Sequence, residues 1–330
     1  MPSSVIILPK TDLDQIIADN ESFFRKADEA RFLITGGTGF VGSWIWQTLQ
    51  RANQVLDLDF QVFVLSRYQL DCSSLSHSNV QFLKHDLLNP IPENFPSFDF
   101  VLSSITPSQP KSGGLSPDYV RRITALGNRH LIEHLRAKSN PVNFFNTSSG
   151  AVTKYNSASR TSSNSINDTY MRAKAELEEY LNSHHQETGI RIINARLFTF
   201  FGPGIPLDAH FAIGNFLNDA LNGRPVKVLG NLNTIRSYLY PTDMVSQIFG
   251  AWFDSNSFEP IPIGSYSRIK IKDLAENISQ KFGNGVVEYA KNHSPLSIYL
   301  PQPFDSNRAQ MQKIDLNEGM GRWVQWLQTE

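Results

Sequence analysis

The sequence has almost no cysteine, no long apolar run and no excess of charge of either sign. Its single cysteine, Cys72, allows neither an internal disulfide nor a cysteine-rich zinc site. No apolar run reaches the roughly 20 residues of a membrane-spanning helix, and the apolar segment near the N-terminus is too short for a signal peptide. The formal net charge of −1 gives no basis for a nucleic-acid-binding surface. We therefore expect a cytoplasmic protein that binds no membrane, nucleic acid or metal.

What the sequence does contain is a regular alternation of apolar strands and helices. Hydrophobic residues make up 40% of the chain and charged residues 18%, which is typical of a folded globular protein. Strands are expected at 31–34, 60–66, 80–83, 98–103, 142–147 and 190–198, and helices at 11–29 (with Thr11 as N-cap), 40–53, 117–138 and 168–184. Residues 157–165, rich in serine and asparagine, are expected to form a loop. The alternation predicts an α/β fold with a doubly wound parallel sheet.

A glycine-rich segment lies between the first expected strand and the helix that follows it. Gly36, Gly39 and Gly42 have the spacing G-x-x-G-x-x-G. Glycines allow a tight turn and a close approach of the backbone to a pyrophosphate, and a helix N-terminus attracts phosphates. An ordinary glycine-rich turn is the alternative, but the strand–turn–helix context favours a dinucleotide site. We predict that Gly36, Gly39, Phe40, Val41 and Gly42 bind the cofactor.

The end of the second expected strand indicates which dinucleotide binds. NAD-selective folds usually place an Asp or Glu there to bond the ribose 2′-OH. This chain has Ser66 and Arg67 instead, and a planar guanidinium suits a 2′-phosphate. The alternative is an arginine that merely lies on the surface of a loop. We predict NADP(H) as the cofactor, ahead of NAD.

Three further residues have the types needed for proton transfer. Tyr170 and Lys174 are four residues apart in a helical segment, which places both on one face. A nearby ammonium lowers the pKa of a phenol from its usual value near 10. Ser149 follows the fifth expected strand, and ligands of doubly wound sheets bind beyond the carboxyl ends of the strands. The alternatives are a solvated helix face and a serine that caps a loop.

These motifs together resemble the extended short-chain dehydrogenase/reductase family of sugar-nucleotide epimerases, dehydratases and ketoreductases. The resemblance covers nearly the whole chain and implies a Rossmann-type fold in which Ser149, Tyr170 and Lys174 are catalytic and Lys174 also contacts the cofactor. It implies further cofactor contacts from Asp86, Leu87 and Thr106. The substrate-binding residues it implies are Ser149, Gly150, His210, Asn215 and Arg236, of which Arg236 would meet a nucleotide diphosphate.

Departures from the family pattern narrow the expected reaction. Family dehydratases carry Asp-Glu directly after the catalytic Ser or Thr, whereas this chain has Gly150 and Ala151, whose side chains transfer no proton. Dehydration is therefore disfavoured. Epimerase/reductases of the family place a cysteine at the position of Ala151 and pair it with a later histidine. His210 is then either a pocket-lining residue, which we prefer, or an acid/base.

Reduction or epimerisation remains. Because Arg67 favours NADPH, we expect a reductase of a nucleotide-linked 4-keto-6-deoxy sugar. The alternatives are a sugar-nucleotide epimerase with tightly bound NAD and a non-catalytic NADP(H)-binding sensor, since a fold does not dictate its chemistry. The family resemblance also implies a homodimer through the helices at 117–138 and 168–184.

We expect the chain to divide into three parts. A helical extension occupies residues 1–30, and an NADP(H)-binding Rossmann domain occupies 31–200, with returning segments at about 236–265. Residues 203–330 mainly form a smaller substrate-binding lobe, with helices at 208–222 and 271–282.

Overall fold

The structure is a computed structural model, and it describes ten stretches of the chain. These are residues 5–67, 79–107, 115–138, 141–154, 166–184, 189–208, 211–254, 259–291, 295–302 and 312–329. They form two compact units. The first comprises Met1–Leu197 and Val245–Ile261, and the second comprises Phe198–Met244 and Pro262–Glu330.

A seven-stranded sheet in the order β3-β2-β1-β4-β5-β6-β9 forms the centre of the first unit. Its strands are β1 (Arg31–Thr35), β2 (Gln61–Ser66), β3 (Val80–Lys84), β4 (Phe100–Ser103), β5 (Val142–Ser149), β6 (Ile190–Leu197) and β9 (Ile261–Ile263). The pairs from β3 through β6 are all parallel. The order reverses direction between β1 and β4, which is the switch point where ligands of such sheets bind.

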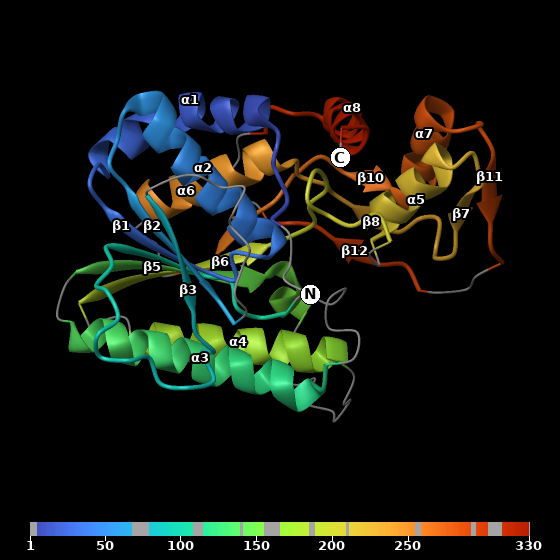
Figure 1. Cartoon of the computed structure of the whole chain (residues 1–330). Coiled ribbons are helices and arrows are strands. Elements are labelled where there is room, and N and C mark those ends of the chain that lie inside the picture. Colours follow the sequence, from blue (N-terminus) through green and yellow to red (C-terminus); the bar gives the residue numbers. More distant parts are fainter. Residues whose placement is uncertain are drawn as a thin grey trace. The chain divides into compact units, whose positions relative to one another are not determined.

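Helices cover both faces of this sheet. On one face α3 (Pro117–Ala137) and α4 (Ile166–His184) run side by side, and on the other α1 (Lys10–Lys26) packs along α2 (Phe40–Leu56) (Figure 1). The α3/α4 face encloses a core in which Phe63, Val101 and Phe144 meet Leu131 and Leu177. Because both faces are buried, the central strands read as nearly continuous apolar runs, as parallel sheets do.

The second unit is built from short elements. Its helices are α5 (Ala212–Leu221), α7 (Ile271–Phe282) and α8 (Leu316–Leu327), and α6 (Pro241–Asp254) passes from this unit into the first. Its strands are β7 (Val226–Val228), β8 (Ile235–Arg236), β10 (Ile269–Lys270), β11 (Val287–Tyr289) and β12 (Ile298–Tyr299). They pair as β10-β8-β12 and β11-β7.

The expected doubly wound α/β fold is confirmed, and the local differences have simple causes. The first helix begins at Lys10 after Pro9, whose fixed φ suits a helix start, so Thr11 is not its N-cap. Strand β5 extends two residues beyond the expected 147, because Ser148 and Ser149 pair with Arg196 and Leu197. Residues 157–165 lie outside the described residues, as does Cys72. None of the described helices is both long and apolar enough to cross a membrane.

Candidate active site

The glycine-rich segment forms a tight turn between β1 and α2. Gly36 has φ +66°, and a Cβ there would overlap the carbonyl oxygen of Ser104 after β4. A Cβ on Gly42 would lie 2.5 Å from the Gly36 carbonyl oxygen. The turn is held by hydrogen bonds to the Gly37 carbonyl from the Ser43 hydroxyl (3.0 Å) and the Trp46 indole (3.1 Å). The turn therefore has no room for side chains at Gly36 or Gly42.

The N-terminus of α2 has the features that a pyrophosphate site needs. Gly39 is the N-cap in an extended conformation and gives the helix no side-chain cap. Phe40, Val41 and Gly42 form the first turn, whose N–H groups lie at the positive end of the helix dipole. No acidic residue lies in this turn. The residues present therefore fit the phosphates of a dinucleotide.

Arg67 lies directly after β2 and is held by Tyr119 on α3. Its guanidinium carbon lies 5.5 Å from the centroid of the Tyr119 ring, and an Nη donates to the Tyr119 hydroxyl. Arg67 itself is exposed. The guanidinium is thus oriented by an aromatic ring at the strand end where a ribose 2′ substituent is recognised in this type of fold.

The other expected cofactor residues lie after β3 and β4. The Asp86 carboxylate accepts a hydrogen bond from the Leu88 N–H at 3.0 Å, which shapes the turn after β3, and Leu87 is buried in the core. Thr106 lies beyond β4, and its hydroxyl is 3.0 Å from the Thr124 hydroxyl on α3. Gly36, Arg67, Asp86 and Thr106 therefore all follow carboxyl ends of neighbouring parallel strands.

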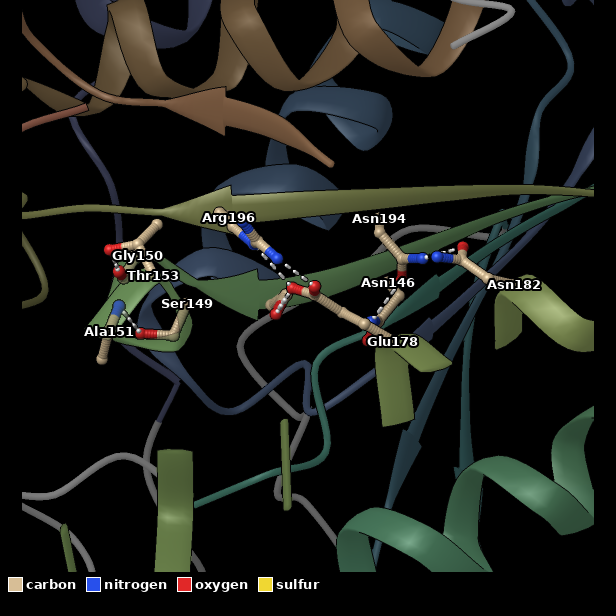
Figure 2. Close-up of polar contacts among 10 residues, drawn as sticks. Asn146, Ser149, Gly150, Ala151, Thr153, Glu178, Asn182, Asn194 and Arg196 are labelled. Atoms are coloured by element: carbon tan, nitrogen blue, oxygen red, sulfur yellow. Dashed lines mark hydrogen bonds and ion pairs between the residues drawn. The ribbon is translucent and has the colours of Figure 1, made fainter. Parts of the chain in front are cut away.

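Ser149 is the last residue of β5, and Gly150 begins a short 3-10 helix, η2 (Gly150–Lys154). The Ser149 hydroxyl accepts the Ala151 N–H at 3.2 Å, so its own proton can be donated elsewhere (Figure 2). The Gly150 carbonyl accepts from the Thr153 hydroxyl at 2.7 Å, which stabilises η2. This geometry gives the end of β5 a hydrogen-bond donor in a fixed place.

Tyr170 and Lys174 lie one turn apart on α4, which packs on β5 and η2. Lys174 is fully buried, and its Nζ donates to the Thr147 carbonyl oxygen at 2.5 Å. Burial lowers the pKa of Lys174 to about 7, while the charge of Glu178 opposes this shift. Tyr170 is partly buried. The helix therefore attaches its lysine to the same strand end that carries Ser149.

The expected substrate-binding residues of the second unit lie on short elements. Arg236 on β8 donates to the carbonyl oxygens of Ile235 (2.9 Å) and Ser297 (3.0 Å) and to the Ser297 hydroxyl (3.3 Å). Half-burial lowers the pKa of Arg236 below its usual value. Asn215 is exposed on α5. His210 lies outside the described residues.

In the part of the chain that the structure describes, no group of three His, Cys, Asp or Glu side chains could hold a metal ion.

Two functional candidates were missed in the sequence. Glu178 follows Lys174 by four residues and binds both Ser148 and Arg196. Tyr170, Lys174 and Glu178 are spaced four residues apart, which keeps all three on one helix face. This spacing in the sequence could have identified Glu178 as a candidate. Tyr119 was also missed, because its contact with Arg67 joins residues 52 apart in the sequence.

A parallel sheet with a glycine turn at its switch point, Ser149 at the end of β5, and Tyr170 and Lys174 on α4 is typical of a dinucleotide-binding scaffold. The model of the NAD dependent epimerase/dehydratase family matches residues 32–254. This chain therefore belongs to the NAD dependent epimerase/dehydratase family.

Among characterised relatives, UDP-glucuronic acid decarboxylase 1 of Xenopus tropicalis is 24% identical over 271 residues. That alignment covers 80% of this chain but 63% of the decarboxylase, so the chain spans less than two thirds of that protein's length.

Solved structures share the fold. The UDP-N-acetylglucosamine 4-epimerase of Methanobrevibacter ruminantium, in complex with UDP-N-acetylmuramic acid, is 20% identical with a TM-score of 0.74, over 92% of this chain and 99% of that one. The Bordetella bronchiseptica enzyme WbmF, in complex with NADH, is 20% identical with a TM-score of 0.72, over 92% and 93%.

Proposed function

We propose that this chain is an NADP(H)-dependent oxidoreductase that reduces the 4-keto group of a nucleotide-linked 4-keto-6-deoxy sugar. The observation that carries the proposal is that Ser149 ends β5 and Lys174 donates to the Thr147 carbonyl of the same strand, with Tyr170 one turn away on α4. Gly150 and Ala151, which transfer no proton, disfavour dehydration. Arg67 at the end of β2 supports NADP(H) over NAD.

Each of the three residues has a distinct task in this reaction. When bound, NADPH supplies the hydride for C4 of the sugar. Ser149 donates a hydrogen bond to the carbonyl oxygen and orients it. Tyr170 gives its phenolic proton to the same oxygen as negative charge develops there. The Lys174 ammonium lowers the pKa of Tyr170, because an adjacent positive charge favours the phenolate.

The remaining assignments extend the proposal to the substrate and cofactor. Arg236 would bind the nucleotide diphosphate. Among the described residues, the hydrogen bonds of its guanidinium go to uncharged oxygens, so its positive charge is available for a phosphate. Asn215 and His210 stay predicted pocket residues. Asp86, Leu87 and Thr106 stay predicted cofactor contacts.

A second candidate is a sugar-nucleotide epimerase that keeps its cofactor bound. It is favoured by the fold neighbours, which include a UDP-N-acetylglucosamine 4-epimerase. A non-catalytic sensor of NADP(H) is a third candidate, against which the intact Ser149, Tyr170 and Lys174 set argues. A homodimer through α3 and α4 and a cytoplasmic location stay predictions.

The decisive assay mixes the protein with NADPH and dTDP-, GDP- or UDP-linked 4-keto-6-deoxyhexoses and follows the absorbance of the reduced nicotinamide. Consumption of NADPH with one of them is the expected result, and no loss with any of them would sink the proposal. Tightly bound NAD+ in the purified protein would favour the epimerase. UDP-glucuronic acid belongs in the same panel, because the decarboxylase of Xenopus tropicalis is named for it.

A further inference from the structure

A partly buried ion pair lies beside the Ser149 strand end. The Glu178 side chain is 6% exposed, and its two carboxylate oxygens accept from Arg196 Nε (3.0 Å) and Nη2 (2.6 Å) (Figure 2). The Ser148 hydroxyl donates to the same carboxylate. Burying such a pair costs solvation, so stability alone is a weak reason for its presence.

The pair joins three elements at the site. Ser148 and Arg196 are register partners on β5 and β6, so their side chains lie next to each other, and Glu178 reaches both of them from α4. Ser148 immediately precedes Ser149. One turn earlier on the same helix, Lys174 binds the Thr147 carbonyl. Helix α4 therefore forms hydrogen bonds with two consecutive residues at the end of β5: Lys174 binds Thr147 and Glu178 binds Ser148.

Glu178 is also the negative charge that acts on Lys174. On α4, the ionisable side chains one turn from Lys174 are Tyr170 and Glu178. The neighbouring elements include Arg196 on β6, Lys154 at the exposed end of η2, and Arg129 of α3, which lies over the ring of Tyr180. β5 carries no ionisable side chain. Burial lowers the pKa of Lys174 and Glu178 raises it. Without Glu178, the Arg196 and Lys174 charges would both lack their shared counter-charge.

We propose that Glu178 is a positioning residue that fixes the Ser148–Ser149 strand end and keeps the Lys174 ammonium charged beside Tyr170. The inference rests on the proposed roles of Ser149, Tyr170 and Lys174. Glu178 itself contacts neither substrate nor cofactor in this scheme. It acts through Ser148 and Lys174.

The test titrates Lys174 in the cofactor-free protein. Lysines labelled with ¹³C at Cε are followed by NMR, and Lys174→Met assigns the signal. Glu178→Gln keeps the size of the side chain and removes its charge, so the pKa of Lys174 should fall by about one unit. Glu179→Gln is the matched control, because Glu179 is the exposed neighbour on the same helix, and it should cause no shift.

A Lys174 pKa that does not move in Glu178→Gln, or that moves equally in Glu179→Gln, overturns the proposal. If Glu178→Gln does not fold, Arg196→Met tests the same charges from the other side. Removing that cation should raise the Lys174 pKa, and an unchanged or lower pKa overturns the proposal.

Enzyme activity supplies an independent readout. In the direction of alcohol oxidation, which needs the Tyr170 phenolate, the pH profile of kcat for Glu178→Gln should shift to higher pH. If no sugar is turned over by the unaltered protein, the proposed function fails, yet the Lys174 titration still decides the role of Glu178.

Discussion

Arg67 lies over the ring of Tyr119 and donates a hydrogen bond to its hydroxyl, which joins the end of β2 to the first turn of α3. An exposed arginine normally samples many rotamers, and ordering it costs up to about 2 kcal/mol. The contact with Tyr119 restricts the rotamers of Arg67 before any ligand binds, so less conformational entropy is lost on binding. A guanidinium oriented in this way is prepared for a phosphate group.

Replacing Arg67 should therefore change cofactor choice. Arg67→Ser removes a charge-assisted contact worth roughly 1.5–3 kcal/mol, so NADPH affinity should fall about 10- to 100-fold while NADH affinity changes little. Tyr119→Leu should weaken NADPH binding by a smaller factor. Fluorescence titrations with both cofactors measure this. Arg121→Ser, which removes an exposed arginine paired with Asp118, is the control. Equal weakening of both cofactors would contradict the assignment.

The phosphate turn should not tolerate a side chain at Gly36. Gly36→Ala forces a positive φ on a residue with a Cβ and pushes that Cβ into the Ser104 carbonyl. The strained backbone alone costs about 1–3 kcal/mol. We expect a lower midpoint of urea unfolding and lost NADPH binding. Gly230→Ala is the control, since a Cβ there meets nothing within 4 Å. Normal binding by Gly36→Ala would contradict the turn's close packing.

Tyr170→Phe should separate chemistry from binding. It removes the phenolic proton but keeps the ring, so turnover should fall by about 10²- to 10⁴-fold. NADPH affinity should stay within a few-fold of the unaltered protein. Stopped-flow turnover and equilibrium titration measure the two quantities. Tyr180→Phe, on the same helix, is the matched control and should keep full turnover. Unchanged turnover in Tyr170→Phe would contradict the catalytic role of Tyr170 and favour a non-catalytic sensor of NADP(H).

Lys174 makes a testable contribution to the pH dependence of stability. Its folded-state pKa is about 7, against an ordinary value of 10.5 in the unfolded chain. Between these values the unfolded chain holds the proton that the folded chain releases, so this group makes stability rise with pH. Relative to Lys174→Met, the unaltered protein should gain about 2 kcal/mol between pH 7 and pH 9. Urea unfolding at both pH values measures the difference, and a constant difference would contradict the lowered pKa.

The first unit could be predicted well because its signals are local. Its strands β1 to β6 are mainly apolar runs of four to eight residues, and the glycine turn and the helix spacing of Tyr170 and Lys174 can be seen in a single stretch of sequence. The contacts of Arg67 with Tyr119 and of Glu178 with Arg196 could not be predicted in this way. Each joins side chains from different elements, and their pairing depends on how the sheet and helices pack.

The second unit was harder to predict for another reason. Its strands β8, β10 and β12 have two residues each, and β7 and β11 have three, too few to show a period. The residues that choose the sugar are expected there. The fold and the cofactor half of the site therefore follow from sequence more directly than the substrate half does.

The packing of α1 has a consequence for synthesis of the chain. Phe24 of α1 contacts Phe249, and Asn20 donates to the Ser246 hydroxyl 226 residues further along. A ribosome adding about 5–20 residues per second makes α1 roughly 10–45 seconds before that partner exists. During this interval the apolar side of α1 has to be shielded by chaperones or by temporary contacts. A translational pause before residue 249 would lengthen the interval and favour aggregation.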